Sequence, residues 1–356
     1  MTKIRVAVLF GGRSSEHSVS CVSASGVMRA LDQQKYDVTA IGISQGGRWF
    51  QMDANTAYSM ADGQVPVVPE YGEGAALSPD PEVLKSQLGE IDVVFPVLHG
   101  PWGEDGTIQG LLELAAIPYV GSGVLASAAG MDKITMKVLL AHAGLEVGSF
   151  VAVTDRQWLT EQNACVDAIR ALGFPVFVKP ARAGSSRGIS KVKQESELVA
   201  AIEEARTHDP RIIVEAGVEK ARELECGVLS GDRGTVSASR VAEIVVGGQH
   251  EFYDFDAKYL EDSAELVVPA DLKIDVELEL QAMAIRAFEA LGCEGLARVD
   301  FFLDSMNTLI INEVNTMPGF TPISMFPRMW QVSGIEYGEL IDTLIADALR
   351  RGTGLR

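Results

Sequence analysis

The stretch of sequence that decides the fold runs from Arg298 to Ser324 and reads RVDFFLDSMNTLIINEVNTMPGFTPIS. Two apolar, β-rich runs lie on either side of the turn-prone residues 304–307, and this pattern predicts a β-hairpin. Side chains two positions apart in a strand share a face, so each arm carries one polar pair. The two pairs are Arg298 with Asp300, and Glu313 with Asn315. A turn with an even number of residues brings both pairs onto one face of the hairpin, whereas an odd number separates them.

Two carboxylates and an amide oxygen on one face suit a hard cation such as Mg²⁺, which also holds substrate phosphates. Arg298 beside them can stabilise negative charge on a reacting oxygen. The alternative is a structural ion pair of Arg298 with Asp300, but Asn315 does not help to neutralise an arginine and does help to bind a metal. The loop that follows contains Pro318 and Gly319, which end the strand and let the backbone approach a ligand. The stretch therefore predicts a metal–phosphate site.

Length and composition limit the class of protein. A chain of 356 residues is expected to hold two or three domains, and a hydrophobic content of 47% excludes a largely disordered protein. The net charge of −19 disfavours binding to nucleic acid or to an anionic membrane. Four scattered cysteines favour a reducing compartment, and no apolar run is long enough for a signal peptide or a membrane span. We therefore expect a cytoplasmic protein without nucleic-acid or membrane partners.

The N-terminal region has the pattern of an open parallel sheet. The apolar run Ile4–Phe10 predicts a strand buried on both faces, followed by a glycine turn and a helix over Val19–Leu31. Such a turn commonly binds an anion or a small polar ligand. Glu16 in the turn could hold a ligand ammonium group, or it could only complement the helix dipole. His99, at the end of a later strand, could be a general base, although a histidine there more often hydrogen-bonds its loop.

Basic residues in the middle of the chain indicate a nucleotide site. Lys179 ends an apolar strand before a loop rich in Gly and Ser, an arrangement that holds ATP phosphates in many folds. Lys133 and Lys137 share one face of a predicted helix, which by itself is more typical of a solvated surface. Glu215 could accept a hydrogen bond from an adenine amino group or be a plain carboxylate on an edge strand. The long polar segment 247–269 is typical of a lid or binding loop.

Taken together, several segments resemble the D-alanine–D-alanine ligase family of the ATP-grasp superfamily. They are GGRSSEHSVS, LHGPWGEDGT, VGSGVLASAAGMDK, FPVFVKPARAGSSRG, DFDAKYL, RVDFF and NEVNTMPGFTPIS, in this order along nearly the whole chain. The resemblance implies an α/β fold with an open parallel-sheet domain at 1–124, a central ATP-grasp domain at 125–220 and a C-terminal ATP-grasp domain at 221–356. ATP is then held between the last two domains.

The resemblance also implies a reaction and its participants. ATP phosphorylates the carboxylate of one D-alanine, and the amine of a second attacks this acyl phosphate to give D-alanyl-D-alanine, ADP and phosphate. Two Mg²⁺ ions, with Mn²⁺ as a substitute, assist the transfer. The family further implies peptidoglycan precursor synthesis and a homodimer.

Roles carry over to matching positions. The implied ATP contacts are Lys133, Lys179, Glu215, Val218, Glu223 and Lys258. The implied metal ligands are Asp300, Glu313 and Asn315, and the implied oxyanion donors are Arg298 and the Gly319 amide. The implied substrate contacts are Glu16 for the first ammonium group, Ser324 for the second carboxylate, and His99. Ser185 and Tyr259 are implied to link to Glu16 and to close the mobile loop.

Two departures and two rival functions remain open. Ala216 replaces a lysine that many relatives carry after the adenine-contacting glutamate, and Ala183 replaces an acidic residue of the phosphate loop. Another ATP-grasp ligase, including one that uses D-lactate, would share the phosphate and metal residues but differ at Glu16, Tyr259 and Ser324. A nucleotide-binding sensor without enzymatic activity could lose Arg298, whose presence argues against it.

Overall fold

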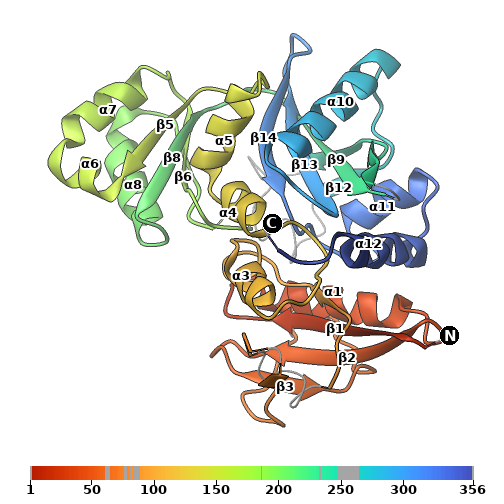
Figure 1. Cartoon of the computed structure of the whole chain (residues 1–356). Helices are drawn as coiled ribbons and strands as arrows, with labels where there is room; N and C mark the ends of the chain where they lie inside the picture. The colour runs from red at the N-terminus through yellow and green to blue at the C-terminus, as the bar shows by residue number, and fades with distance from the viewer. Residues whose placement is uncertain are drawn as a thin grey trace.

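The structure is a computed structural model that describes residues 2–60, 65–75, 78–80, 82–83, 89–185, 187–231, 234–246 and 264–354. Its described part contains three β-sheets, each packed against its own helices (Figure 1). The N-terminal sheet lies below the other two in this view, and the central and C-terminal sheets stand side by side above it. Residues 247–263, which include most of the predicted lid, lie outside the described part.

The N-terminal sheet is mainly parallel, as the sequence predicts. It consists of β1 (Ile4–Gly11), β2 (Tyr36–Ile43), β3 (Trp49–Met52) and β4 (Val93–Pro96), in the order β3-β2-β1-β4. β1 runs parallel to β2 and to β4, and only the edge strand β3 is antiparallel. Alternate residues of β1 pack towards α1 (His17–Ala30) on one face and α3 (Thr107–Leu114) on the other. Both faces of β1 are therefore buried, which explains its continuous apolar run.

The central sheet is antiparallel, with three helices of its own on one face, whereas Ile134 of α5 (Lys133–His142) packs with Ile213 on the other face. Its strands are β5 (Phe150–Thr154), β6 (Val176–Pro180), β7 (Ser190–Val192) and β8 (Arg211–Ala216), in the order β5-β8-β6-β7. The helices on the first face are α6 (Asp155–Thr160), α7 (Gln162–Arg170) and α8 (Leu198–Arg206), and the 3₁₀ turn Glu195–Glu197 directly precedes α8. Because β8 lies between β5 and β6, Glu215 is not on an edge strand, and that alternative interpretation of Glu215 is wrong.

The strands of the C-terminal sheet pair in an antiparallel manner. Its strands are β9 (Arg222–Ser230), β10 (Val236–Ala238), β11 (Ala242–Val246), β12 (Ala264–Val267), β13 (Leu296–Leu303) and β14 (Leu309–Asn315). One face packs against α10 (Ile274–Ala290), and α4 (Val124–Met131) and α5 (Lys133–His142) join the same core. α11 (Met325–Val332) and α12 (Tyr337–Arg351) pack towards the N-terminal domain. The predicted domain limits 1–124, 125–220 and 221–356 stay a prediction.

The predicted hairpin is formed by β13 and β14, and its register depends on a β-bulge. The loop runs from Asp304 to Thr308 and so has an odd number of residues, which by itself would place the two polar pairs on opposite faces. Phe301 pairs with Ile311, but Asp300 pairs with Glu313, so Asn312 is an extra residue. The bulge restores the shared face. The predicted face is therefore confirmed, although the sequence rule alone would have failed with this loop length.

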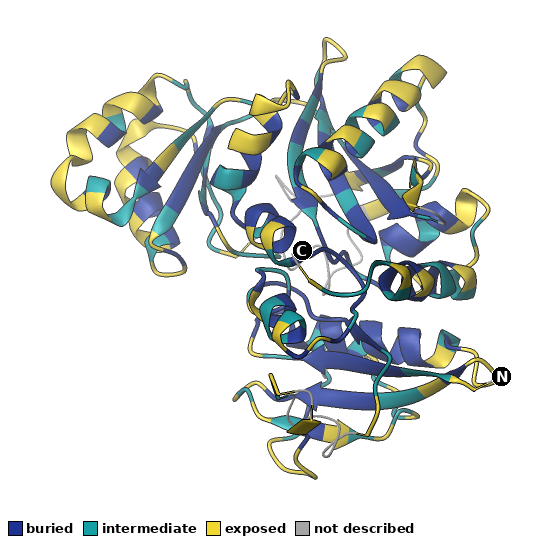
Figure 2. Cartoon of the chain, viewed as in Figure 1, coloured by how far each residue is buried: buried dark blue, intermediate teal, exposed yellow. Residues whose placement is uncertain are grey.

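Burial follows the same division (Figure 2). The strands and the inner helix faces are buried, whereas the outer faces of α6, α7 and α10 are exposed. No helix in the described ranges combines the length and the apolar character that a membrane span requires.

Candidate active site

A cleft of about 1460 Å³ lies where the three domains meet, and its walls come from all of them. It collects every candidate site residue that the structure describes. These are Glu16, His99, Lys133, Lys179, Ser185, Glu215, Val218, Glu223, Arg298, Asp300, Glu313, Asn315, Gly319 and Ser324. The two remaining candidates, Lys258 and Tyr259, lie outside the described residues.

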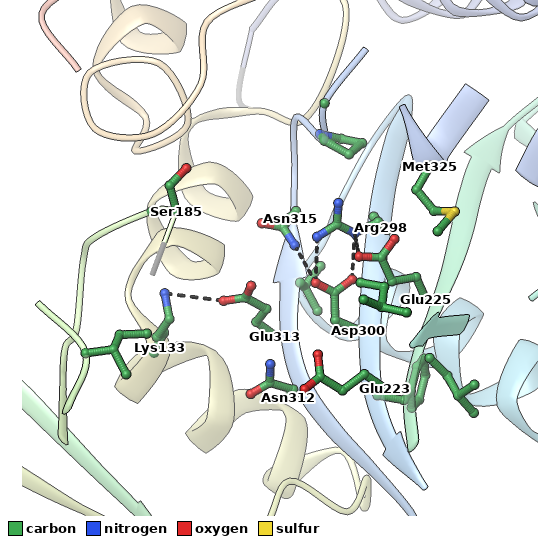
Figure 3. Close-up of a pocket in the computed structure, with 18 of the residues that line it drawn as sticks. Lys133, Ser185, Glu223, Glu225, Arg298, Asp300, Asn312, Glu313, Asn315 and Met325 are labelled. Atoms are coloured by element: carbon green, nitrogen blue, oxygen red, sulfur yellow. Dashed lines mark hydrogen bonds and ion pairs between the residues drawn. The ribbon is translucent and has the colours of Figure 1, made fainter. Parts of the chain in front are cut away.

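Arg298 and Asp300 form the centre of the cleft wall that β13 contributes (Figure 3). The guanidinium of Arg298 makes two hydrogen bonds of 2.7 Å to the two carboxylate oxygens of Asp300, and its Nε lies 3.2 Å from Glu225 Oε1. Burial lowers the pKa of Arg298, but the negative charges of Asp300 and Glu225 raise it well above its ordinary value. Arg298 is therefore a fixed cation next to the reaction space.

The predicted metal ligands lie next to one another on the same face. Asn315 Nδ2 donates a 3.1 Å hydrogen bond to Asp300 Oδ2, and Glu313 Oε2 lies 3.4 Å from Lys133 Nζ. Among the described residues no three His, Cys, Asp or Glu side chains form a metal-binding group, and the third oxygen donor on this face is the Asn315 amide. Two carboxylates and the Asn315 amide, once turned, give hard oxygen ligands that fit Mg²⁺ and leave positions for phosphate oxygens.

A buried trio of charges lines the other side of the cleft. Glu215 accepts from Lys137 Nζ at 2.7 Å through one oxygen and from Lys179 Nζ at 2.5 Å through the other. Burial raises the pKa of Glu215, but the two ammonium groups outweigh it and lower the pKa to about 2. The trio keeps one net positive charge in the cleft. Because both oxygens of Glu215 are engaged by lysines, an adenine amino group has to compete with them.

Lys137 is a functional candidate that the sequence interpretation underrated. Only 3% of it is exposed, and it also donates to Val147 O at 2.8 Å. The expectation of a solvated lysine pair is therefore wrong, since Lys133 is also largely buried and donates to Ala183 O at 3.0 Å. The sequence indicated the position of Lys137 only in part. A spacing of four residues places Lys133 and Lys137 on one helix face, but it does not show which part of the protein that face contacts.

Glu16 occupies the N-terminal end of α1 and faces the central domain. Ser185 Oγ donates a 2.5 Å hydrogen bond to Glu16 Oε1. Two glycines from different loops approach the same carboxylate so closely that a Cβ at either Gly100 or Gly184 would lie 2.4 Å from Glu16 Oε2. The predicted link between Ser185 and Glu16 is thus present, and the absence of side chains at both glycines makes it sterically allowed.

His99 and Ser324 lie on the boundary between the N- and C-terminal domains. Burial lowers the pKa of His99, and both ring nitrogens are engaged, with Met317 O at 3.0 Å and Ser23 Oγ at 3.2 Å. This geometry favours the hydrogen-bonding interpretation of His99 over that of a general base. Ser324 precedes the first residue of α11, and its Oγ accepts from Thr321 N at 3.1 Å. The start of α11 thereby lines the cleft, where a helix N-terminus favours an anionic group.

Two further carboxylates were not predicted from the sequence. Glu225 lies two residues after Glu223 on the cleft face of β9 and contacts Arg298. Glu104 accepts from the backbone of Gly100 and of Met317, and burial together with the charge of Glu16 raises its pKa to about 8. The alternation of β9 could have indicated Glu225, whereas nothing in the local pattern around Glu104 shows that a distant backbone meets it.

Family models match both ends of the chain. The model of the D-ala D-ala ligase N-terminus matches residues 5–122, and that of the D-ala D-ala ligase C-terminus matches residues 139–346. The chain is 54% identical to a D-alanine–D-alanine ligase of Paenarthrobacter aurescens (strain TC1), covering 99% of this chain and 97% of the relative. It is 56% identical to a D-alanine–D-alanine ligase of Pseudarthrobacter chlorophenolicus, with coverages of 99% and 96%.

Solved structures show the same fold. The VanG D-Ala:D-Ser ligase from Enterococcus faecalis superposes with a TM-score of 0.83 at 36% identity, covering 98% of this chain and all of that one. The D-alanine-D-alanine ligase from Coxiella burnetii superposes with a TM-score of 0.79 at 32% identity, with coverages of 99% and 95%. The expected three-part ATP-grasp architecture is thereby confirmed. The chain belongs to the D-alanine–D-alanine ligase family.

Proposed function

We propose that the protein ligates two molecules of D-alanine to D-alanyl-D-alanine, with cleavage of ATP to ADP and phosphate, for the synthesis of peptidoglycan precursors. The observation that carries this proposal is the hairpin face, where Arg298, Asp300, Glu313 and Asn315 converge on one cleft. Membership of the ligase family supports the choice of substrate.

In this proposal the lysines hold the nucleotide. Lys133 and Lys179 contact ATP phosphates, and both are already held by carboxylates, Glu313 and Glu215. Incoming phosphate oxygens replace these carboxylates as partners of the ammonium groups. Val218 and Glu223, which line the same cleft, contact the adenine and the ribose. Lys258 is proposed as a further phosphate contact.

Asp300, Glu313 and Asn315 would hold Mg²⁺, whose chemistry is to offset charge on the transferring phosphoryl group. Two ions, and replacement by Mn²⁺, are part of the proposal. The chain's own contribution to the acyl transfer is Arg298, a permanent cation, together with the Gly319 N–H. Both line the cleft, and both would donate to the oxygen that becomes negative when the acyl carbon turns tetrahedral.

The amino acids are proposed to bind between Glu16 and the start of α11. The Glu16 carboxylate pairs with the ammonium group of the first D-alanine, and Ser185 keeps that carboxylate oriented. Ser324 and the first turn of α11 receive the carboxylate of the second D-alanine. His99 is proposed to support the first subsite by its hydrogen bond to the backbone oxygen of Met317, and not by transferring a proton. Tyr259 is proposed to close the site from the lid.

The second substrate, which attacks the acyl phosphate and is called the acceptor, is the part of the proposal for which another candidate exists. The superposition on a D-Ala:D-Ser ligase shows that the fold accommodates a different second substrate. The higher identity to D-alanine–D-alanine ligases favours D-alanine. A homodimer and a cytoplasmic location, where ATP is available, complete the proposal; light scattering and cell fractionation test them.

The test is product analysis with purified protein, ATP and Mg²⁺. D-alanine alone is expected to give D-alanyl-D-alanine with one phosphate released per dipeptide. Mixtures of D-alanine with D-serine, D-lactate or L-alanine are expected to give little mixed product. If D-alanyl-D-serine or the D-lactate ester predominates, the second substrate is D-serine or D-lactate and not D-alanine. ATP binding without phosphate release would favour a nucleotide-binding sensor without enzymatic activity.

A further inference from the structure

The carboxylate of Glu104 connects two loops that are far apart in the sequence. Its Oε2 accepts from the Gly100 N–H at 2.6 Å, within its own loop of the N-terminal domain. Its Oε1 accepts from the Met317 N–H at 3.0 Å, in the segment that follows β14 of the C-terminal domain. One side chain of the N-terminal domain therefore holds the backbone next to Gly319.

A second side-chain relay from the N-terminal domain reaches the same segment. His99 Nδ1 lies 3.0 Å from Met317 O, and because a carbonyl only accepts, Nδ1 carries the proton. His99 Nε2 then accepts from the Ser23 hydroxyl at 3.2 Å. The Ser23 oxygen in turn accepts from the Phe320 N–H at 3.4 Å. Both polar backbone atoms of Met317 and the N–H of Phe320 are thus held by the N-terminal domain.

Packing fixes the end of this segment as well. The side chain of Phe320 is fully buried, and its ring centroid lies 5.7 Å from those of Phe95 and Tyr337. Tyr337 also donates from its hydroxyl to Phe320 O at 2.7 Å. Phe95 belongs to β4, so apolar contacts reinforce the polar ones across the domain boundary.

Gly319, in the middle of the segment 317–320, carries a backbone N–H that none of these contacts engages. Pro318 has no N–H, and within the described residues the Gly319 N–H has no hydrogen-bond acceptor. Both residues line the cleft. A short segment whose ends are fixed, and whose central residue lines the cleft with an N–H that has no acceptor among the described residues, has the features of a preorganised donor.

We propose that Glu104 and Ser23 are positioning residues that set the Gly319 N–H from the N-terminal domain, through the backbone of Met317 and Phe320. The inference rests on the proposed function, in which Gly319 donates to the developing oxyanion. It goes further because it makes the oxyanion donor of the C-terminal domain depend on side chains of the amino-acid-binding domain. Displacements of about 1 Å at a reacting centre can lower rates about 10²-fold, so loss of either contact is expected to reduce turnover.

The experiment compares two variants that remove a contact to the backbone of residues 317–320, called the clamp variants, with one control. Glu104→Gln keeps the shape but leaves only one oxygen that accepts, so one of the two backbone N–H groups loses its partner. Ser23→Ala removes the acceptor of the Phe320 N–H, and Ser23 does not line the cleft. The control is Gln109→Met: Gln109 is buried and donates to Gly103 O at 2.8 Å, so it supports the same loop without contacting residues 317–320.

Three readouts separate positioning from a structural role. The first is kcat with D-alanine, the second is the Kd of a non-hydrolysable ATP analogue, and the third is amide hydrogen exchange over residues 316–324 without ligands. Both clamp variants are expected to lower kcat about 10-fold or more, to keep the nucleotide Kd within about twofold, and to speed exchange of this segment. The control is expected to lower the Tm while kcat and exchange of residues 316–324 stay unchanged.

Two outcomes overturn the inference. If the clamp variants lower only the Tm, as the control does, then Glu104 and Ser23 merely join the domains. If nucleotide affinity falls together with kcat, the contacts set the domain arrangement in general and not the Gly319 N–H. Should Glu104→Gln fail to fold, Ser23→Ala gives the same two outcomes. Failure of the proposed function shows separately, as wild-type protein that makes no D-alanyl-D-alanine, and the exchange readout does not depend on it.

Discussion

Asp300 is paired with Glu313 across the hairpin because Asn312 adds one residue to β14. In a regular ladder that continued from the pairing of Phe301 with Ile311, Asp300 would lie opposite Asn312, and Glu313 would face away from the cleft. The face opposite the cleft packs against α10 in an apolar core. The shared face of Asp300 and Glu313 therefore depends on the bulge at Asn312.

Insertion of one alanine between Asn312 and Glu313 is expected to abolish ligation, because with the bulge unchanged the new residue lies opposite Asp300 and Glu313 turns towards the apolar core. Activity should fall by more than about 10³-fold, and the Tm should fall as well, since a buried carboxylate is destabilising. The control is Asn312→Ala, which keeps the residue count and should retain activity within about 10-fold. Equal loss in both variants would mean that any change at this position, and not the register of Glu313, lowers activity.

Asp300→Asn and Glu313→Gln are each expected to lower kcat by orders of magnitude and to raise the Mg²⁺ concentration needed for half-maximal rate. Steady-state rates over a Mg²⁺ titration measure both effects. Glu339→Gln, on α12, is the matched change of a carboxylate elsewhere and should have no effect. Wild-type rates at saturating Mg²⁺ in either hairpin variant would make the hairpin purely structural.

Arg298→Lys keeps the positive charge but loses the planar pair of donors that now binds Asp300. Loss of one oxyanion donor typically lowers kcat about 10²–10³-fold, and a reduction of that size is expected here with the fold intact. Single-turnover rates together with circular dichroism provide the measurement. Kinetics like those of the wild type would return Arg298 to the role of a structural ion pair.

Lys137→Met is expected to destabilise the protein and to raise the KM for ATP. Removing one partner of a buried ion pair typically costs about 3–5 kcal/mol, and the loss here should be smaller because Lys179 still pairs with Glu215. Lys179 then becomes the sole counterion of Glu215 and is less available to a phosphate. Urea unfolding and ATP titration measure the two effects, with the exposed Lys273→Met as control. An unchanged KM for ATP would contradict the link between the two lysines.

The charge trio also predicts how stability depends on pH. Lys179 and Lys137 lower the pKa of Glu215 from 4.5 to about 2 in the folded protein. The unfolded chain therefore binds a proton first, so this contribution is fully present above about pH 5 and is lost as the pH falls towards 2. The difference in unfolding free energy between wild type and Glu215→Gln should shrink across this window. A difference that stays constant from pH 5 to pH 3 would contradict the assignment.

Sequence patterns predicted the strands well, because hydrophobic periodicity and the preference for turns depend on residues that are neighbours in the sequence. The apolar run Ile4–Phe10 gave β1, and the paired runs around residues 304–307 gave β13 and β14. The candidate residues that the structure describes do meet in one cleft. Their common location followed from the family resemblance, since no spacing rule relates Glu16 to Arg298.

The unpredicted features are those that depend on tertiary contacts. The bulge at Asn312 has no signature in the sequence, and the five-residue loop without the bulge would give the opposite face. Lys137 looked like a surface lysine because its partner, Glu215, is distant in sequence and reaches it only through β8. Glu104 could not be identified because its second partner is the backbone of Met317, which has no side-chain signature in the sequence.

The measurement that tests the account most directly is the transfer of oxygen from substrate to phosphate. The protein is supplied with ATP, Mg²⁺ and D-alanine labelled with ¹⁸O in both carboxylate oxygens, and the released phosphate is analysed by mass spectrometry. If the carboxylate is phosphorylated and then attacked by the second amine, each phosphate carries one ¹⁸O from D-alanine. Phosphate without ¹⁸O, released while dipeptide forms, would contradict activation of the carboxylate by ATP.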